Sequence, residues 1–227
     1  MLRRLFMRNA ILYKLWFKKC GKSKLKLPNR KDSFYFAGYP RSGNTYFTKL
    51  ISAVLPELIF SHHLHTVGAI KLAFQSKLPV LIIIREPLES VASLYIMNNK
   101  GSSLNVELID KYIEDYVEYH TFVFDNRSII KIVEFEKLIK KPQLILDSLK
   151  NLDINLSIQQ TDYDILASKV KNNMVQKSQL KMSKEHALRF SSTPNSHRNS
   201  LKEEVKKSII ANYNLNKAST LFKALIK

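Results

Sequence analysis

The segment from Gly38 to Thr45 carries residue types that can hold an anion. The chain has only five glycines, and two of them, Gly38 and Gly43, lie five positions apart. Glycine permits the sharp bend that lets successive backbone N–H groups and a helix N-terminus point into one concavity. Arg41, Ser42 and Thr45 add side-chain donors. The pattern predicts a phosphate- or sulfate-binding loop, although an ordinary turn between a strand and a helix also uses glycine.

The same spacing fits the nucleoside-triphosphate loop G-x-x-x-x-G-K-[ST], except that Asn44 replaces the lysine. That lysine neutralises the β and γ phosphates, and an amide carries no charge. Such proteins also end a neighbouring strand in an aspartate that holds magnesium, whereas the apolar run at 80–84 is followed by Arg85. A cation there repels a metal ion and attracts an anion. We therefore expect no metal, and a nucleotide kinase with a degenerate loop is the alternative.

Three of the six histidines lie within four positions, at His62, His63 and His65. Histidine suits a general base because its ordinary pKa lies near neutral pH. A metal site is less favoured, because His62 and His63 would point to opposite faces if the strand continued, and no Asp, Glu or Cys lies beside them.

From Ser33 onward, short apolar runs alternate with helical patterns, which predicts a single α/β domain with a mostly parallel central sheet flanked by helices. The expected strands are 33–38, 58–62, 80–84 and 128–134. The expected helices are 44–54, 66–75, 88–99 and 106–126. Further helices should reach about Lys169, followed by a polar loop or lid up to Ser200 and a terminal helix from Leu201.

Residues 1–31 are expected to form a basic amphipathic segment ahead of the domain at 32–227. They contain eleven Lys or Arg and no acid, which is +11 of the formal net charge of +18. Charged residues interrupt every apolar run, so the segment can neither span a bilayer nor serve as a signal peptide. It is either a helix on an anionic membrane face, anchored by Trp16 and Phe17, or a helix packed on the domain.

The overall composition is that of a globular chain, with 227 residues, 45% hydrophobic and 25% charged. Cys20 is the single cysteine, which excludes an internal disulfide and a cysteine-based zinc site. We expect a cytoplasmic location with optional peripheral membrane contact. The charge attracts anions without choosing among phosphates, acidic glycans, lipids and nucleic acid.

Two segments resemble motifs of one family, the sulfotransferases that use 3'-phosphoadenosine 5'-phosphosulfate. Residues 39–46, YPRSGNTY, resemble the 5'-phosphosulfate loop Y-P-[KR]-S-G-[TN]-[TN]-[WYL]. Residues 85–95, REPLESVASLY, resemble the 3'-phosphate segment, R-[ND]-P with a serine eight positions after the arginine. The resemblance covers residues 34 to about 145 and implies a P-loop-like nucleotide-binding architecture.

The resemblance implies transfer of a sulfuryl group from this donor to a hydroxyl or amine, without a metal. It assigns Arg85 and Ser93 to the 3'-phosphate and gives Arg41 the role of stabilising charge in the transfer. The residues that it implies for donor binding around the 5' end are Arg41, Ser42, Gly43, Asn44, Thr45 and Tyr46.

The family's K-[TS]-H-[LF]-P segment aligns with residues 61–65, SHHLH, when its fourth position is matched to Leu64. This alignment makes His63 the expected catalytic base, with His62 as the second choice. The chain departs from the pattern because it lacks the lysine and the proline of this segment.

Two later positions complete the predicted site. Residues 133–138, VEFEKL, resemble the family strand ending in [YF]-E-[DK]-L, so Phe135 either lines the nucleotide pocket or is a core aromatic. The family's R-K-G loop is absent, since no glycine follows Gly101. Arg198 is the remaining candidate for closing over the 3'-phosphate.

The acceptor class and the partners are less constrained. The positive charge favours an acidic glycan or a glycolipid as acceptor. A non-enzymatic polyanion or nucleic-acid binder that uses the basic N-terminal segment is the alternative from another class. Nucleic acid is not expected as a partner, because no nucleic-acid module is recognisable and aromatic residues do not alternate with the basic ones along a sheet.

Overall fold

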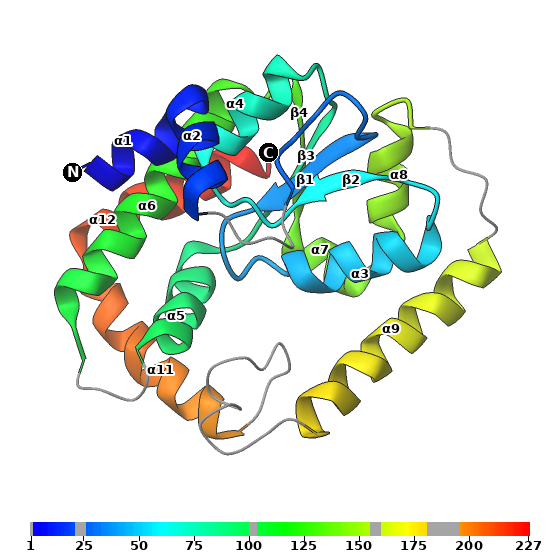
Figure 1. Cartoon of the computed structure of the whole chain (residues 1–227). Helices are drawn as coiled ribbons and strands as arrows, with labels where there is room; N and C mark the ends of the chain where they lie inside the picture. The colour runs from blue at the N-terminus through cyan, green and yellow to red at the C-terminus, as the bar shows by residue number, and fades with distance from the viewer. Residues whose placement is uncertain (1, 21–25, 100–103, 155–159, 181–195) are drawn as a thin grey trace.

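The computed structural model is an α/β domain built on one four-stranded sheet (Figure 1). It describes residues 2–20, 26–99, 104–154, 160–180 and 196–227. The paired strands are parallel and follow the order β2-β1-β3-β4. Their bounds are β1 Phe34–Gly38, β2 Phe60–His62, β3 Val80–Ile84 and β4 Ile130–Glu134. The predicted fold class, including the P-loop-like order of strand, loop and helix at β1, is confirmed.

The first half holds six helices in the described part of the chain. They are α1 Leu2–Arg8, α2 Ala10–Cys20, α3 Asn44–Val54, α4 Val67–Gln75, α5 Pro87–Asn98 and α6 Val106–Asp125. The four with predicted bounds, α3 to α6, begin and end within one residue of those bounds. Local signals explain several of their ends. The side chain of Thr66 accepts a hydrogen bond from the Ala69 N–H at the start of α4, and α5 begins with Pro87 at its first turn.

The second half is more helical than the sequence predicted. Its helices are α7 Phe135–Lys140, α8 Leu144–Lys150, α9 Gln160–Leu180, α11 Ser196–Ile210 and α12 Tyr213–Leu225. The predicted loop or lid between Lys169 and Ser200 is therefore wrong over 170–180 and 196–200, while residues 181–195 lie outside the described part. The loop was predicted because the stretch is rich in polar residues. However, the Lys, Gln, Met and Leu residues of this stretch all favour a helix.

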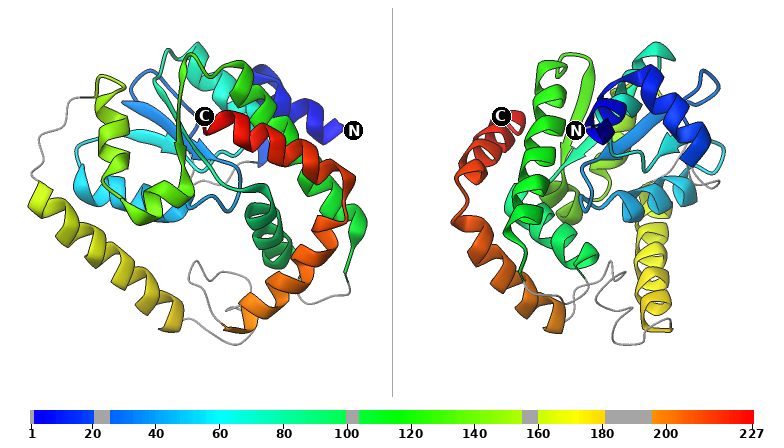
Figure 2. Two further views of the ribbon diagram at one scale, coloured as in Figure 1. Left: turned by 180° about the vertical axis from the view of Figure 1, so that it is seen from behind. Right: turned by 60° about the vertical axis from the view of Figure 1, so that its left-hand side comes forward.

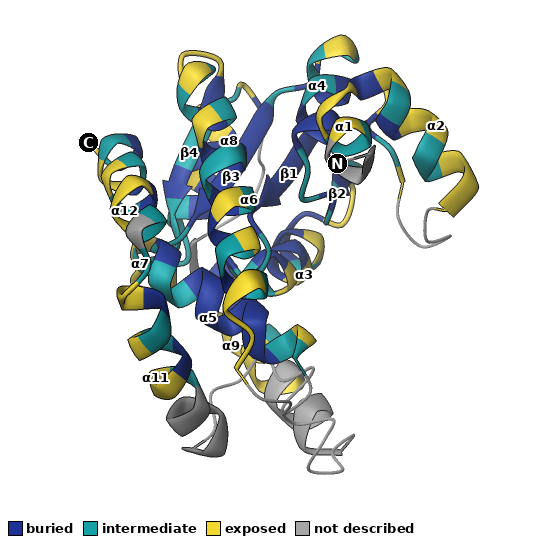
Figure 3. Cartoon of the chain, turned by 90° about the vertical axis from the view of Figure 1, so that its left-hand side faces the viewer, coloured by how far each residue is buried: buried dark blue, intermediate teal, exposed yellow. Residues whose placement is uncertain are grey.

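Helices cover both faces of the sheet, so that every residue of the two central strands, β1 and β3, is buried (Figure 3). Successive residues of β1 alternate between two cores. Tyr35 packs with α4, α5, α6 and α12, and Phe34 and Phe36 pack with α3, α8 and α9. From behind, α12 and α11 run alongside α6 and α5 (Figure 2). The C-terminal helices thereby come close to the end of β3.

The strand order brings two chain segments to one edge of the sheet. From β1 the chain first crosses to β2 on one side and then returns to β3 on the other, so β1 and β3 are neighbours. Gly38, the last residue of β1, is paired with Ile83. In open α/β sheets, ligands bind at the carboxyl ends of strands where the order reverses in this way. The segments after Gly38 and Ile84 leave the sheet at such a point.

The N-terminal helices pack on α4 rather than standing apart from the domain. Tyr13 is buried, and a Cβ added at Gly68 would lie 2.8 Å from the Tyr13 Cβ. Trp16 and Phe17, the predicted membrane anchors, are half-buried against the same core. The boundary between 1–31 and 32–227 stays a prediction. Among the described residues, no helix combines the length and the hydrophobicity that crossing a bilayer requires.

Candidate active site

The loop between β1 and α3 turns sharply over four residues. The Ser42 N–H donates to the Tyr39 carbonyl at 3.2 Å, which closes a turn with Pro40 at its second position and Arg41 at its third. Arg41 has a φ of 73°, the positive value that the third position of a type II turn requires. Glycine or asparagine usually occupies this position, and a residue with a Cβ costs about 1–2 kcal/mol there. The fold thus holds an arginine where the backbone favours glycine.

Gly43 is required by its contacts as well as by its backbone. It is the N-cap of α3 with a φ of 81°, and a Cβ at this position would lie 2.6 Å from the Phe135 ring. Phe135, at the start of α7, therefore packs directly against the loop and also contacts Phe47 edge-on. The ring of Phe135 packs against the core, as one of its two predicted roles requires. The other role, lining a nucleotide pocket, stays a prediction.

Asn44 braces the loop from inside. Its Nδ2 donates to the carbonyl oxygens of Gly38 at 3.4 Å and Tyr39 at 3.2 Å, and the residue is buried. A lysine amine in this position would need a counter-charge that the two carbonyls do not supply. The replacement of the triphosphate-loop lysine by Asn44 therefore has a structural reason, which the motif comparison alone could not give.

The side chain of Arg41 reaches across to α5. Its Nε donates to the Ser93 Oγ at 2.9 Å, and its Nη1 lies 3.6 Å from the Met97 Sδ. Ser93 is buried two turns into the helix that follows β3. Two residues that the sequence assigned to opposite ends of one nucleotide are thus in direct contact.

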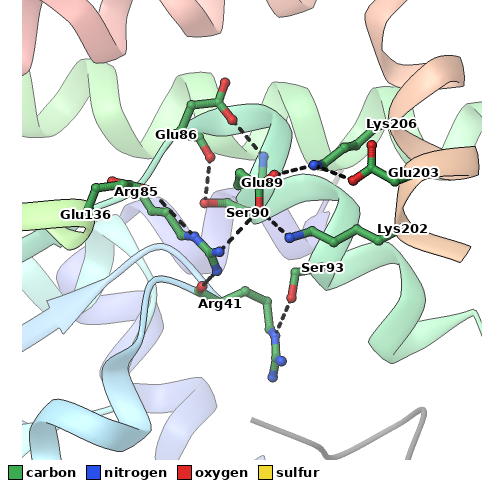
Figure 4. Close-up of polar contacts among 10 residues, drawn as sticks. All are labelled: Arg41, Arg85, Glu86, Glu89, Ser90, Ser93, Glu136, Lys202, Glu203 and Lys206. Atoms are coloured by element: carbon green, nitrogen blue, oxygen red, sulfur yellow. Dashed lines mark hydrogen bonds and ion pairs between the residues drawn. The ribbon is translucent and has the colours of Figure 1, made fainter. Parts of the chain in front are cut away.

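Arg85 links the same two segments through its own contacts (Figure 4). Its Nη1 donates to the Arg41 carbonyl at 2.9 Å, and its Cζ lies 4.4 Å from the centre of the Phe135 ring. It also forms ion pairs with Glu89 at 3.3 Å and with Glu136 at 3.9 Å. Burial lowers the pKa of Arg85, and the neighbouring carboxylates oppose that shift. The guanidinium is therefore fixed under the loop, and the carboxylates of Glu89 and Glu136 compensate most of its positive charge.

Two lysines of α11 complete this charge cluster. Lys202 and Lys206 both contact the Glu89 carboxylate (Figure 4). Burial alone would raise the pKa of Glu89, but the hydrogen bonds and charges of the two lysines lower it to about 2. Neither lysine was predicted, since they lie more than a hundred residues away along the chain and no local pattern marks them. The ion pair of Glu89 with Arg85 could have been predicted, because Glu89 stands four residues after Arg85.

The three neighbouring histidines lie beside the loop. The His62 Nδ1 is 2.6 Å from the His63 Nδ1, and the His63 Nε2 is 3.3 Å from the Thr45 Oγ1. The rings would point to opposite faces only if the strand continued past His62, but β2 ends at His62 and His63 turns back with a φ of 61°. The His65 Nδ1 donates to the Gly38 carbonyl at 2.6 Å. The sequence gave His65 no role, and the structure gives it one in holding the end of β1.

Burial makes these histidines weak bases. It lowers the pKa of His63 to about 4, with further lowering by His62, His65 and Lys49. It lowers the pKa of His65 to about 4 as well, although the hydrogen bond to Gly38 opposes the shift. All are therefore neutral near pH 7. In the described part of the chain, no group of three His, Cys, Asp or Glu side chains is arranged to hold a metal ion.

The remaining predicted positions fall near the loop or outside the described set. Ser42 is fully buried, and its Oγ has no hydrogen-bond partner among the described residues. Tyr46 packs edge-on against Phe47 in the first turn of α3. The backbone of Arg198 belongs to α11, but its side chain lies outside the described part.

Comparison with known proteins adds one structural likeness. No family model matches the chain, and no curated protein matches its sequence. Among solved structures, the chain is similar to mouse sulfotransferase SULT7A1 complexed with PAP, with a TM-score of 0.49 and 12% identical residues. The similarity covers 87% of this chain and 89% of that chain.

Proposed function

We propose that the chain binds 3'-phosphoadenosine 5'-phosphosulfate and transfers its sulfuryl group to a hydroxyl or amine without a metal ion. The observation that carries this proposal is the contact of Arg41 with both Ser93 and Arg85, each at 2.9 Å. These residues come from the ends of two neighbouring strands and the helix after the second. One edge of the sheet thus gathers donors for a ligand that is anionic at two positions.

The residues of the loop fit the phosphosulfate end of such a donor. Among the described side chains, none caps the N-terminus of α3, where the backbone N–H groups lack helical partners. The partial positive charge of this terminus favours an anion. The buried Ser42 Oγ is a further donor without a partner in the described part of the chain. These groups match sulfate or phosphate oxygens and need no metal ion to do so.

We assign the proton transfer to the Nε2 of His63. The short contact between the Nδ1 atoms of His62 and His63 requires one to donate and the other to accept. When the His63 Nδ1 donates, its Nε2 carries the free lone pair and accepts the acceptor's proton. His62 then acts as a positioning residue that fixes this tautomer. Thr45, 3.3 Å from the Nε2, marks the side of the loop toward which the base points.

Arg41 stabilises the charge that develops during transfer. The bound donor supplies a sulfuryl group whose bond to the 5'-phosphate breaks while the acceptor atom forms a bond to sulfur. Negative charge grows on the leaving phosphate oxygen, and a guanidinium in fixed orientation stabilises it without reorganisation. Arg41 is held in that orientation by Ser93 and by its turn.

We assign the other end of the donor to Arg85 and Ser93, with Lys202 closing the site from α11. Lys202 lies four residues after Arg198, the position that the sequence proposed for this role, and its amine contacts the Glu89 carboxylate beside Arg85. A 3'-phosphate would compete with Glu89 for both cations. The acceptor class stays the one proposed from the charge, an acidic glycan or a glycolipid.

Calorimetric titration tests the donor before any acceptor is known. Adenosine 3',5'-bisphosphate should bind the full chain without magnesium, and Arg85→Ala should weaken that binding by at least about tenfold. Tighter binding of ATP with magnesium would favour the kinase alternative and overturn the proposal. Unchanged affinity in the Arg85 variant would remove this residue from the site.

The polyanion-binder alternative needs a test that keeps the fold intact. Deleting residues 1–31 would remove Tyr13 from the core and expose α4, so loss of binding would not be informative. Replacing the exposed Lys14, Lys18 and Lys19 by glutamine removes charge and leaves this packing unchanged. Loss of bisphosphate binding in that variant would favour the binder.

A further inference from the structure

The outer face of α2 combines aliphatic and lysine side chains. Ile11, Lys14, Leu15 and Lys18 follow the three- and four-residue spacing that places side chains along one helix face. Ile11 is 66% exposed and Leu15 is 57% exposed, and both lysines are exposed. Two large aliphatic side chains therefore lie side by side in solvent between two lysines.

The domain itself cannot cover this face. The opposite side of α2 packs inward through Tyr13, with Trp16 stacked on it at 5.9 Å between ring centres and Phe17 beside it. The close approach of Tyr13 to Gly68 fixes the helix against α4. Figure 3 shows the result as buried residues toward α4 and exposed ones on the far side of α2. Rolling the helix to bury Ile11 would bring the aromatic side chains out of the core.

The preceding helix adds a third aliphatic side chain to the same N-terminal unit. Leu5 of α1 is 54% exposed. The Asn9 N–H donates to the Leu5 carbonyl at 3.2 Å, and the Asn9 Oδ1 accepts from the Ile11 N–H at 2.9 Å. Arg8 pairs with Glu118 of α6 and so ties α1 to the domain. Both helices are thus held in place with their aliphatic side chains outward.

We propose that the exposed face of α2, with Ile11, Lys14, Leu15 and Lys18, docks on the face of an anionic lipid bilayer, and that the exposed Leu5 of α1 adds a further aliphatic contact. Aliphatic side chains bordered by lysines match the boundary between acyl chains and headgroups. Each cation near an anionic leaflet strengthens the attraction, and residues 1–31 hold eleven cations without one acid. Nucleic acid would pair with the lysines but leave the aliphatic side chains in water, so the lipid surface is the better match.

Co-sedimentation of the full chain with vesicles tests this proposal. The chain should bind phosphatidylcholine vesicles that contain phosphatidylserine, and should bind vesicles of phosphatidylcholine alone much more weakly. The triple variant Leu5→Ser, Ile11→Ser and Leu15→Ser should lower partition into the anionic vesicles by roughly 100-fold, because it removes the side chains that leave water.

A matched control carries the same change elsewhere on the surface. Ile129, Ile139 and Ile165 are 59%, 51% and 67% exposed and lie outside the N-terminal helices. Their triple serine variant should bind the anionic vesicles as the parent chain does. Both variants should keep the near-ultraviolet circular dichroism and the bisphosphate affinity of the parent, since none of the six positions belongs to the site.

Three results would overturn the proposal. Equal binding by the N-terminal serine variant would show that charge alone is responsible, as a polyanion binder requires. An equal loss in the control variant would show that exposed aliphatic side chains anywhere on the surface contribute as much as those of the N-terminal helices. Binding that does not weaken as salt is raised would exclude the proposed contribution of the lysines.

Discussion

The two basic regions of this chain hold their cations in different ways. On α2, Lys14 and Lys18 are exposed, and residues 1–31 contain no acid to pair with them. At the sheet edge, Arg41 and Arg85 are partly buried. Arg41 donates a hydrogen bond to Ser93 of α5, and Arg85 donates one to the loop carbonyl of Arg41. The first arrangement attracts any anionic surface. The second fixes the position of each donor, which is what recognition of one ligand requires.

The two regions also differ in backbone conformation. The N-terminal helices use ordinary helical conformations, whereas Arg41 and His63 have φ values of 73° and 61°. Residues with a Cβ adopt such values at a cost of about 1–3 kcal/mol, and they concentrate at functional sites. The site therefore holds two residues in backbone conformations that the N-terminal helices do not use.

The largest expected effect that separates the two regions comes from His63. His63→Ala should lower turnover by about 10² to 10⁴, measured as release of adenosine 3',5'-bisphosphate from the donor in the presence of an acidic glycan acceptor. His62→Ala should have a smaller effect, since His62 only orients the neighbouring ring. A mild loss for His63 with a severe one for His62 would exchange their roles.

The pH dependence sharpens this assignment. In the free protein the pKa of His63 is lowered to about 4, so the limb of kcat/KM should lie near that pH, with activity lost below it. A bound anionic donor favours the protonated imidazole, so the pKa rises in the complex and the limb of kcat should lie at higher pH. Coincident limbs would argue against His63 as the base.

A second effect separates the side chain of Arg41 from its backbone. Arg41→Ala and Arg41→Gly should both lower the rate of transfer by about 100-fold, because both remove the guanidinium. Glycine adopts the positive φ freely, so the glycine variant should unfold with a free energy about 1 kcal/mol larger than that of the alanine variant. Thermal or denaturant unfolding of the pair measures the difference. Equal stabilities would mean that the turn is not strained.

The sequence predicted those parts of the site that depend on local patterns. Gly38 and Gly43 mark the loop, and an apolar run followed by Arg85 marks the end of the next strand. Parallel topology then requires the two to meet, and in the structure Arg85 contacts the loop carbonyl of Arg41. The role of each residue in binding or catalysis stays a prediction.

The remainder depends on long-range packing that no local pattern carries. Lys202 contacts Glu89 because α11 packs along α5, and no sequence pattern between residues 90 and 200 predicts that contact. The rings of His62 and His63 meet because His63, the first residue after β2, turns back with a φ of 61°. The inward face of α2 could not be chosen either, since the helix has aliphatic or aromatic residues on both sides.

A third, smaller effect concerns the carboxylate that neutralises the site. Glu89→Gln should strengthen binding of adenosine 3',5'-bisphosphate by about threefold to tenfold, because Arg85 and Lys202 then lack a competing charge. Calorimetry measures the change. Glu203→Gln is the matched control, since the exposed Glu203 pairs with Lys206 at 2.8 Å, whereas the described ion pairs of Arg85 are with Glu89 and Glu136. Its affinity should be that of the parent.

The same variant has a signature in stability. Lys202 and Lys206 hold the pKa of Glu89 at about 2, below its ordinary value. Its contribution to the free energy of unfolding is therefore complete above pH about 4.5 and is lost as the pH falls toward 2. The glutamine variant should lack this part of the acid dependence. Identical acid unfolding of the two proteins would mean that the lysines do not hold the carboxylate.

The smallest expected effect is the most direct comparison of the two regions. Replacing Lys14, Lys18 and Lys19 by glutamine removes three charges from α2, yet bisphosphate affinity should change by less than about twofold at physiological salt, where charges beyond about 8 Å are screened. The same variant should bind anionic vesicles less well, because each lysine contributes about 1 kcal/mol near such a surface. A parallel loss of both activities would mean that the nucleotide site depends on the bulk charge of the chain. Loss of vesicle binding alone would show that the two basic regions bind separate ligands. The exposed lysines of α2 would attract the membrane through their number, and the arginines of the sheet edge would bind the nucleotide through their fixed positions.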